Sequence, residues 1–277
     1  IWSVGGESDE YETRLADAAP MTASRKTDPE DPMILMYTSG TTGSPKGALL
    51  PARKVFYNSA NAGLYFANGP EDRVLVAAPL FHSLALQILA LPIMRAGGGL
   101  VLQSGFDPAR VWDAVDEFGI TYFGGVPSMH QRLEDTLASS PPDHWVRPHL
   151  RFVFTAGSAA SVELIRSFEA RGILMIQGYG QTETTAQIGN SPGQEMKPGS
   201  MGRPLPGYRI ALLDPFDQEH DEGEIAIDVR HTRPLGLMQE YRDDPERMAK
   251  ALHDGYYRTG DVARRDADGY YWYVGRA

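Results

Sequence analysis

The residues best suited to chemistry in this sequence form a glycine-rich loop at positions 39–47. The loop holds three glycines, four hydroxyl side chains and one lysine, Lys46, and it directly follows an apolar run at 33–38 that predicts a buried β-strand. Glycines allow backbone N–H groups to turn toward an anion, hydroxyls donate further hydrogen bonds, and a lysine ammonium supplies a mobile positive charge. The loop is therefore predicted to bind a polyphosphate.

Two other interpretations of this loop are weaker. A flexible surface connector explains the glycines, but it does not explain why they surround a lone lysine after a buried strand. The ordinary P-loop of nucleoside triphosphatases requires glycine before the lysine and serine or threonine after it, whereas Pro45 and Gly47 stand there. A standard P-loop NTPase is thus the less favoured interpretation.

A second polar motif, Gln177-Gly178-Tyr179-Gly180-Gln181-Thr182-Glu183-Thr184, follows an apolar run at 173–176. Parallel sheets present ligands at the carboxyl ends of their strands, where this motif is expected. There Tyr179 could stack on a purine, Thr182 could bind a phosphate oxygen, and Glu183 could hold Mg²⁺, which prefers oxygen ligands. The alternative is structural, with Thr182 as the N-cap of a helix and Glu183 in its first turn.

A carboxylate beside a glycine turn occurs in Tyr257-Arg258-Thr259-Gly260-Asp261. Asp261 could accept hydrogen bonds from both hydroxyls of a ribose. In most sequences with this pattern, however, the aspartate is a solvated residue in a turn. Arg276, the second-last residue, would by itself be a solvated charge. Neither residue predicts a site without the other motifs.

Composition narrows the class of protein and its partners. The chain has 26 basic and 36 acidic side chains, a formal net charge of -10, which disfavours nucleic acid and anionic lipid surfaces as partners. Because there is no cysteine, disulfides, thiolate metal sites and a cysteine nucleophile are excluded. No apolar run reaches the roughly 20 residues that cross a bilayer, so no membrane span is predicted, and the cytoplasm is the default location. A hydrophobic content of 42% predicts a folded chain.

The elements that must position these motifs alternate between short apolar runs and amphipathic stretches up to about residue 177. This alternation predicts an α/β fold with a mostly parallel sheet flanked by helices. Strands are expected at 33–38, 73–77, 99–103, 120–123, 151–155 and 173–177. Helices are expected after Asp107 and Pro108, as N-cap and first residue, and after Pro127.

The residue pattern changes in the second half of the chain. Glycine and proline without periodicity fill 189–207, which indicates a boundary near Gly207. Beyond it, strands expected at 208–213, 224–229 and 270–274 suggest a small β-rich subdomain. The predicted division is 1–32 as the tail of an upstream segment or a linker, 33–206 as an α/β nucleotide-binding subdomain, and 207–277 as the β-rich subdomain.

In this order the motifs resemble those of the adenylate-forming superfamily, which contains acyl-CoA synthetases, luciferases and nonribosomal-peptide adenylation domains. The loop at 39–47, with Tyr37 and Thr38 before it, looks like that family's phosphate loop, and the likeness extends through nearly the whole chain. It implies an α/β nucleotide-binding domain followed by a distorted β-barrel subdomain. It also implies that a carboxylate attacks the α-phosphate of ATP to give an acyl-adenylate and pyrophosphate, after which coenzyme A displaces AMP.

The resemblance assigns roles to residues of this sequence. Lys46, Thr182 and Glu183 are implied in catalysis, with Glu183 as a ligand of Mg²⁺. Asp261 and Arg276 are implied to contact the ribose, and the loop around Ser158 the edge of the adenine. His82, in Pro79-Leu80-Phe81-His82-Ser83, and Gly180 are implied to border the acyl tunnel. The full set implied to bind ATP or AMP is Thr38, Ser39, Gly40, Thr41, Thr42, Gly43, Lys46, Gly157, Ser158, Ala159, Tyr179, Gly180, Gln181, Thr182, Asp261 and Arg276.

The resemblance also narrows the acid. The motif at 178–183 and the stretch Arg233-Pro234-Leu235-Gly236 look more like medium-chain acyl-CoA synthetases than like peptide adenylation domains. Acetate-specific relatives place a tryptophan where Gly180 stands. Carboxylates longer than acetate, such as fatty acids, are therefore expected as substrates alongside ATP and coenzyme A.

The chain departs from the family at both ends. Relatives carry a long segment before the phosphate loop and, after the position of Gly275 and Arg276, a small mobile domain with a lysine that contacts the reacting carboxylate. None of the five lysines here matches that residue, so the chain is expected to be a fragment that binds nucleotide but adenylates poorly. Two alternatives stay open: a non-catalytic module that binds AMP or an acyl-adenylate, and an adenylation domain that loads a carrier-protein thiol.

Overall fold

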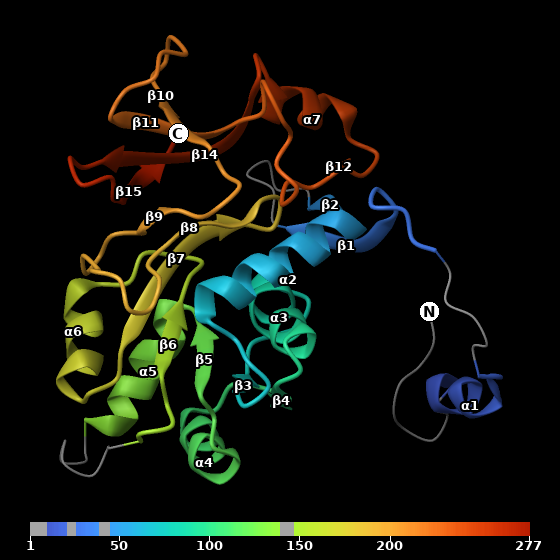
Figure 1. Cartoon of the computed structure of the whole chain (residues 1–277), viewed down its shortest axis with the longest axis vertical. Coiled ribbons are helices and arrows are strands. Elements are labelled where there is room, and N and C mark those ends of the chain that lie inside the picture. Colours follow the sequence, from blue (N-terminus) through green and yellow to red (C-terminus); the bar gives the residue numbers. More distant parts are fainter. Residues whose placement is uncertain (1–9, 21–25, 39–44, 139–146) are drawn as a thin grey trace.

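The computed structural model describes residues 10–20, 26–38, 45–138 and 147–277, and its largest sheet is mostly parallel (Figure 1). The strands of this sheet are β3 (Arg73–Val76), β4 (Gly99–Leu102), β5 (Tyr122–Gly125), β6 (Phe152–Thr155), β7 (Met175–Gln181), β8 (Thr185–Gly189) and β9 (Arg203–Pro204). They lie in the order β4-β3-β5-β6-β7-β8-β9, with the first five parallel and the last two antiparallel to their neighbours. The predicted α/β fold with a mostly parallel sheet is confirmed.

Helices cover both faces of this sheet (Figure 1). On one face lie α4 (Pro108–Phe118), α5 (Pro127–Leu137) and α6 (Val162–Ala170), and on the other α2 (Ala52–Phe66), the π-helix η1 (Leu84–Ala90) and α3 (Leu91–Arg95). Neighbouring strand residues divide between the two cores: Leu75 and Phe123 pack under α4–α6, whereas Val74 and Tyr122 pack under α2 and η1. Strands buried on both faces explain why the sequence shows continuous apolar runs here.

The predicted helix starts at Asp107 and Pro127 are confirmed. The Asp107 carboxylate accepts hydrogen bonds from the backbone N–H groups of Ala109 and Arg110, at 3.0 and 3.3 Å. Pro127 is the first residue of α5. A further helix, α1 (Glu10–Asp17), precedes the sheets in the chain.

The strand expected at 33–38 forms, but it does not join the parallel sheet. It is β1 (Pro32–Thr38), which pairs antiparallel with β2 (Lys46–Pro51), and β2 pairs in turn with β12 (Glu240–Tyr241). Only one of its seven residues, Met36, is buried, whereas a strand inside a parallel sheet is buried on both faces. The register brings Thr38 opposite Lys46, and the segment 39–44 lies outside the described residues.

A second antiparallel sheet follows, with strands β10 (Ile210–Leu213), β11 (Glu222–Asp228), β13 (Leu252–His253), β14 (Tyr256–Arg265) and β15 (Tyr271–Arg276), and with α7 (Pro245–Ala251) beside it. The sequence predicts no strand at β14, because polar Thr259 and Asp261 occupy inward positions and hide the alternation. Asp261 therefore lies in a strand and not in a solvated turn. The pairing of β14 with β11 shifts register between Glu224 and Ala226, opposite Gly260 with its φ of +74°, and such bulges redirect side chains.

The predicted boundary near Gly207 stays a prediction. Tyr241 lies beyond that boundary, yet it pairs with Ala48 of β2, before the boundary. Residues from both sides of the predicted boundary therefore pair in one antiparallel sheet.

Candidate active site

The carboxylate of Asp261 joins three of the predicted motifs. Its Oδ2 accepts hydrogen bonds from the Tyr179 hydroxyl at 2.8 Å and from Nε2 of Gln181 at 2.7 Å, and its Oδ1 accepts one from Arg276 at 2.7 Å. Asp261 is 6% exposed. Burial, together with the nearby Asp261 charge, raises the pKa of Tyr179 well above its usual value, so this phenol remains a neutral donor.

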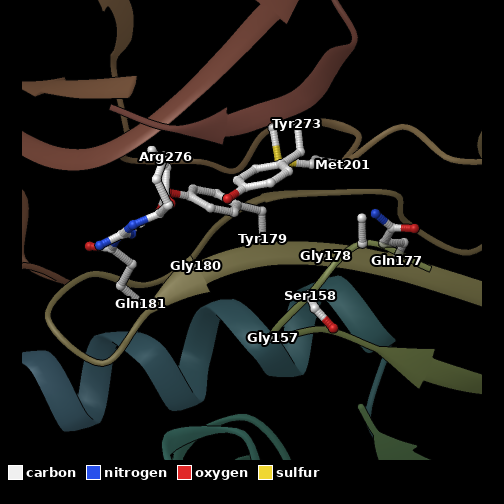
Figure 2. Close-up of a pocket in the computed structure, with 12 residues that line it drawn as sticks. Gly157, Ser158, Gln177, Gly178, Tyr179, Gly180, Gln181, Met201, Tyr273 and Arg276 are labelled. Carbon is white, nitrogen blue, oxygen red and sulfur yellow. Dashed lines mark hydrogen bonds and ion pairs between the residues drawn. The ribbon is translucent and has the colours of Figure 1, made fainter. Parts of the chain in front are cut away.

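A cavity of about 330 Å³ opens beside this cluster (Figure 2). We call it the first cavity; its walls are Gly157, Ser158, Ala159, Gln177, Gly178, Tyr179, Gly180, Gln181, Met201, Asp261, Tyr273 and Arg276. It lies at the carboxyl ends of β6 and β7, where α/β sheets bind ligands. β7 extends past the end of β6. Its last four residues therefore pair with β8 on one side and with no strand of the described residues on the other.

The first cavity offers hydrogen-bonding atoms and aromatic rings suited to a nucleoside. Oε1 of Gln177 is buried on its wall, and it has no hydrogen-bond partner in the described part of the chain. The Tyr179 and Tyr273 rings lie on the side opposite Gly157 and Ser158 in Figure 2. An acceptor without a partner fits the amino group of a purine, since a buried polar atom left unsatisfied is costly. Gln177 opens the motif at 177–184 but has no predicted role, and Met201 and Tyr273 lie outside the predicted motifs.

The predicted catalytic residues Lys46 and Glu183 form an ion pair, with Nζ and Oε1 2.6 Å apart. The Tyr241 hydroxyl accepts a hydrogen bond from Lys46 at 2.9 Å and donates one to Glu183 at 2.8 Å. Burial opposes the ionisation of Glu183, but the charge and hydrogen bond of Lys46 outweigh it and lower the pKa of Glu183. Burial likewise opposes the charge on Lys46, and Glu183 reverses that effect and raises the pKa of Lys46. Both groups are therefore charged at neutral pH.

Thr182 and Glu183 lie in a turn between β7 and β8, and no helix begins there. The helix-cap interpretation of Thr182 is thus excluded. The backbone N–H of Thr184 bonds the Gln181 carbonyl at 3.1 Å, and the Thr184 hydroxyl accepts the Gln181 N–H at 3.1 Å. Met238 donates its N–H to the Glu183 carbonyl at 2.7 Å. The turn is held by contacts within it and from the chain beyond β11.

A second cavity of about 590 Å³ adjoins the first, because Gln181 and Arg276 line both. Its other walls include Lys46 and Tyr241, and basic side chains from α7 and β14: Arg247, Lys250 and Arg258. Acidic Glu224, Asp244 and Glu246 lie on the same walls. Lys46 and Arg276 therefore border one continuous hollow.

The predicted phosphate loop can be followed only at its ends. Ser39, Gly40, Thr41, Thr42 and Gly43 lie outside the described residues. Thr38 ends β1, and its buried Oγ1 has no hydrogen-bond partner among the residues that the structure places. Lys46 begins β2 at the other end.

A third, apolar cavity of about 70 Å³ shares Gly157 and residues 178–181 with the first. Its apolar walls include Leu84, Ile88, Phe154 and Ala186. His82, predicted to border this region, does not line it; its side chain is exposed and its ring packs on Phe81, 4.5 Å between centroids.

Gly180 lines both the first and the third cavity, and packing inside the chain also requires a glycine at this position. A Cβ atom at this position would stand 1.9 Å from the backbone oxygen of Thr185. Glycine is therefore required for the close approach of β8, independently of any ligand.

A metal ion has only partial support from the described residues. They contain no group of three or more His, Asp or Glu side chains placed to hold a metal ion. Mg²⁺ is commonly bound by one or two carboxylates together with phosphates and water. Glu183 fits such a site only when phosphates supply further ligands.

Across the described ranges, no helix combines the length and the apolar character that crossing a membrane requires.

Comparison with known proteins agrees with this geometry. The chain is 34% identical to the feruloyl-CoA synthase of an Amycolatopsis species over 255 residues, which cover 89% of this chain and 50% of that protein. The structure of ATP-bound MatB from Rhodopseudomonas palustris superposes with a TM-score of 0.86 at 27% identity, covering 96% of this chain and 52% of that one. The o-succinylbenzoate coenzyme A synthetase of Bacillus subtilis, in complex with ATP and magnesium, gives a TM-score of 0.81 at 26% identity, covering 95% and 54%.

The chain thus spans about half the length of the proteins that it matches. The model of one family, described as AMP-binding enzyme, matches residues 3–241. The chain therefore belongs to the AMP-binding enzyme family.

Proposed function

We propose that the protein containing this chain uses ATP to convert a carboxylic acid into an acyl-adenylate, releases pyrophosphate, and transfers the acyl group to coenzyme A. One observation carries the proposal. The Asp261 cluster borders the first cavity and Lys46 borders the second, and these cavities adjoin, as the two ends of one nucleoside triphosphate require. The named functions of CoA-forming relatives support the acceptor.

We assign the first cavity to the adenosine of ATP. Gln177 and the loop at 157–159 would meet the base, and Asp261 and Arg276 the ribose. A carboxylate has about four acceptor positions, and Asp261 already uses three. Binding a ribose by two hydroxyls therefore requires that Tyr179, Gln181 or Arg276 release Asp261 or share it.

We assign the second cavity to the phosphates. An oxygen of the acid attacks the α-phosphorus while the bond to pyrophosphate breaks, so no protein nucleophile is needed. Lys46 would neutralise charge on the phosphate oxygens, and Thr182 would donate a hydrogen bond to them. Glu183 keeps Lys46 charged and, with the phosphates, would hold Mg²⁺, which spreads the negative charge of the triphosphate when bound.

The third cavity supports an acid with an apolar group. It shares a wall with the first cavity, and an acyl group bonded to the α-phosphate must lie close to the nucleoside. Fatty acids longer than acetate remain our proposed substrates, with coenzyme A favoured over a carrier-protein thiol by the relatives' names.

The direct test is exchange of labelled pyrophosphate into ATP by the full-length enzyme, measured with and without each of a series of carboxylic acids. We expect exchange that depends on the acid and that Lys46→Met lowers at least a hundredfold. ATP cleavage to ADP and phosphate without any acid would contradict the proposal.

A further inference from the structure

A buried lysine that the proposed chemistry does not use lies beside the turn of Thr182 and Glu183. Lys54, in the first turn of α2, is 0% exposed. Its ammonium donates to the hydroxyl of Thr185 and to the backbone oxygen of Gly236, 2.9 Å away. Burial lowers the pKa of Lys54 to about 7, against the opposing charge of Glu183. A buried ammonium at the positive end of a helix is unfavourable in itself, so its retention calls for a local reason.

The residue that Lys54 holds has a strained backbone. Thr185 has a φ of +60°, in the left-handed region that β-branched residues rarely adopt. It is the first residue of β8, directly after the turn at 182–184. Such a conformation persists only when surrounding contacts impose it. The Lys54 ammonium on the Thr185 hydroxyl is one such contact, and the Tyr208 hydroxyl on the Thr184 carbonyl is another.

Lys54 is also connected to the turn indirectly, through hydrogen bonds of the loop that contains Gly236. Gly236 lies in a loop whose neighbouring carbonyls, at Leu235 and Leu237, accept hydrogen bonds from Arg53 at 2.9 and 2.8 Å. The next residue in that loop, Met238, donates its N–H to the Glu183 carbonyl at 2.7 Å. The start of α2 thus fixes both flanks of the turn: Thr185 directly, and Glu183 through the loop.

We propose that Lys54 is a positioning residue that fixes the turn at 182–184, so that Thr182 and Glu183 meet the triphosphate and its metal. This inference rests on the proposed function. Because Lys54 touches the turn and not the walls of the first cavity, its loss should weaken binding of the phosphates and leave binding of the nucleoside unchanged.

The test is calorimetric titration of the 277-residue chain with AMP and, separately, with ATP and Mg²⁺. Lys54→Met keeps the length of the side chain and removes its donors. We expect it to lower the affinity for Mg²⁺-ATP at least tenfold and to change that for AMP less than twofold. Lys26→Met, at an exposed lysine, is the matched control and should change neither.

A second variant removes the same contact by changing its acceptor. Thr185→Ala removes the acceptor and should show the same split between Mg²⁺-ATP and AMP, and in the double variant the two losses should not add. It also covers the case in which Lys54→Met fails to fold. Folded variants that bind Mg²⁺-ATP as the wild type does, or that lose both ligands equally, would overturn the inference. A wild-type chain that binds neither ligand would instead count against the proposed function.

Discussion

The ammonium nitrogen of Lys46 lies 2.6 Å from a carboxylate oxygen of Glu183, and the Tyr241 hydroxyl bonds both. The pair joins β2, which begins where the glycine-rich loop ends, to the turn between β7 and β8. Two motifs that are distant in the sequence thereby meet at one point. Any phosphate that binds Lys46 must compete with Glu183 or share the cation with it.

The exposure of the two side chains predicts which substitution in this ion pair lowers the unfolding free energy more. Lys46→Met leaves a carboxylate that is only 4% exposed without its counter-charge, which should cost about 3 kcal/mol of unfolding free energy. Glu183→Gln leaves an ammonium that is 23% exposed and can be hydrated, so the loss should be smaller. Urea unfolding of both variants measures the difference, and equal losses would speak against a buried ion pair.

Tyr241 should matter through its hydroxyl alone. Tyr241→Phe removes the hydrogen bond to Glu183 and should lower stability by about 1 kcal/mol, with a several-fold loss of Mg²⁺-ATP affinity. Tyr256→Phe is a suitable control, because that ring packs against Arg230 and lies outside the cavities described above. A Tyr241 variant indistinguishable from this control would show that the hydroxyl does not support Glu183.

Gly180 should not tolerate even a methyl group. The Cβ of Gly180→Ala would stand 1.9 Å from the Thr185 oxygen, so β8 must shift, at a cost of about 3 kcal/mol. Gly63→Ala, inside α2 with nothing within 4 Å of the new atom, should instead be neutral or stabilising by up to about 1 kcal/mol. Thermal unfolding of the two variants compares them directly, and a Gly180→Ala protein as stable as the Gly63 variant would refute the close approach.

Lys54 should make stability depend on pH in a defined direction. Burial lowers its pKa to about 7 in the folded chain, from 10.5. Between those values the unfolded chain binds more protons, so this group makes stability rise with pH, whereas below pH 7 it is charged in both states and adds no slope. The stability of Lys54→Met relative to wild type should therefore fall by about 2 kcal/mol from pH 6.5 to 9. Denaturant unfolding at both pH values measures this change, and a difference independent of pH would mean that burial does not lower the pKa of Lys54.

The parts of the fold that local pattern determines were predictable. The parallel strands show as apolar runs, and Asp107 and Pro127 mark helix starts by their own chemistry. The strand β14 escaped prediction because Thr259 and Asp261 turn polar side chains inward, toward the site that they help to form. Polar residues at buried positions of the candidate site thus override the alternation that would have revealed the strand.

The site shows the same division. Lys46 and Glu183 lie in motifs that stand out from the sequence, whereas Asp261 and Arg276 are identified only through the resemblance that those motifs carry. Tyr241 does not, because it reaches Glu183 through a two-residue strand that pairs with β2, a contact that no local signal announces. Lys54 was equally hidden, since a lysine in the first turn of a helix is usually exposed.

Binding of a non-hydrolysable acyl-adenylate analogue to the 277-residue chain, measured by calorimetry, tests the central claim most directly. The wild-type chain should bind, and Asp261→Ala should weaken binding at least tenfold, about 1.4 kcal/mol, because Asp261 would hold the ribose. Asp221→Ala, at an exposed carboxylate paired with Arg265 of the same sheet, should bind as the wild type does. A folded wild-type chain that does not bind the analogue, or an Asp261 variant that binds it equally well, would contradict the assignment of this cavity.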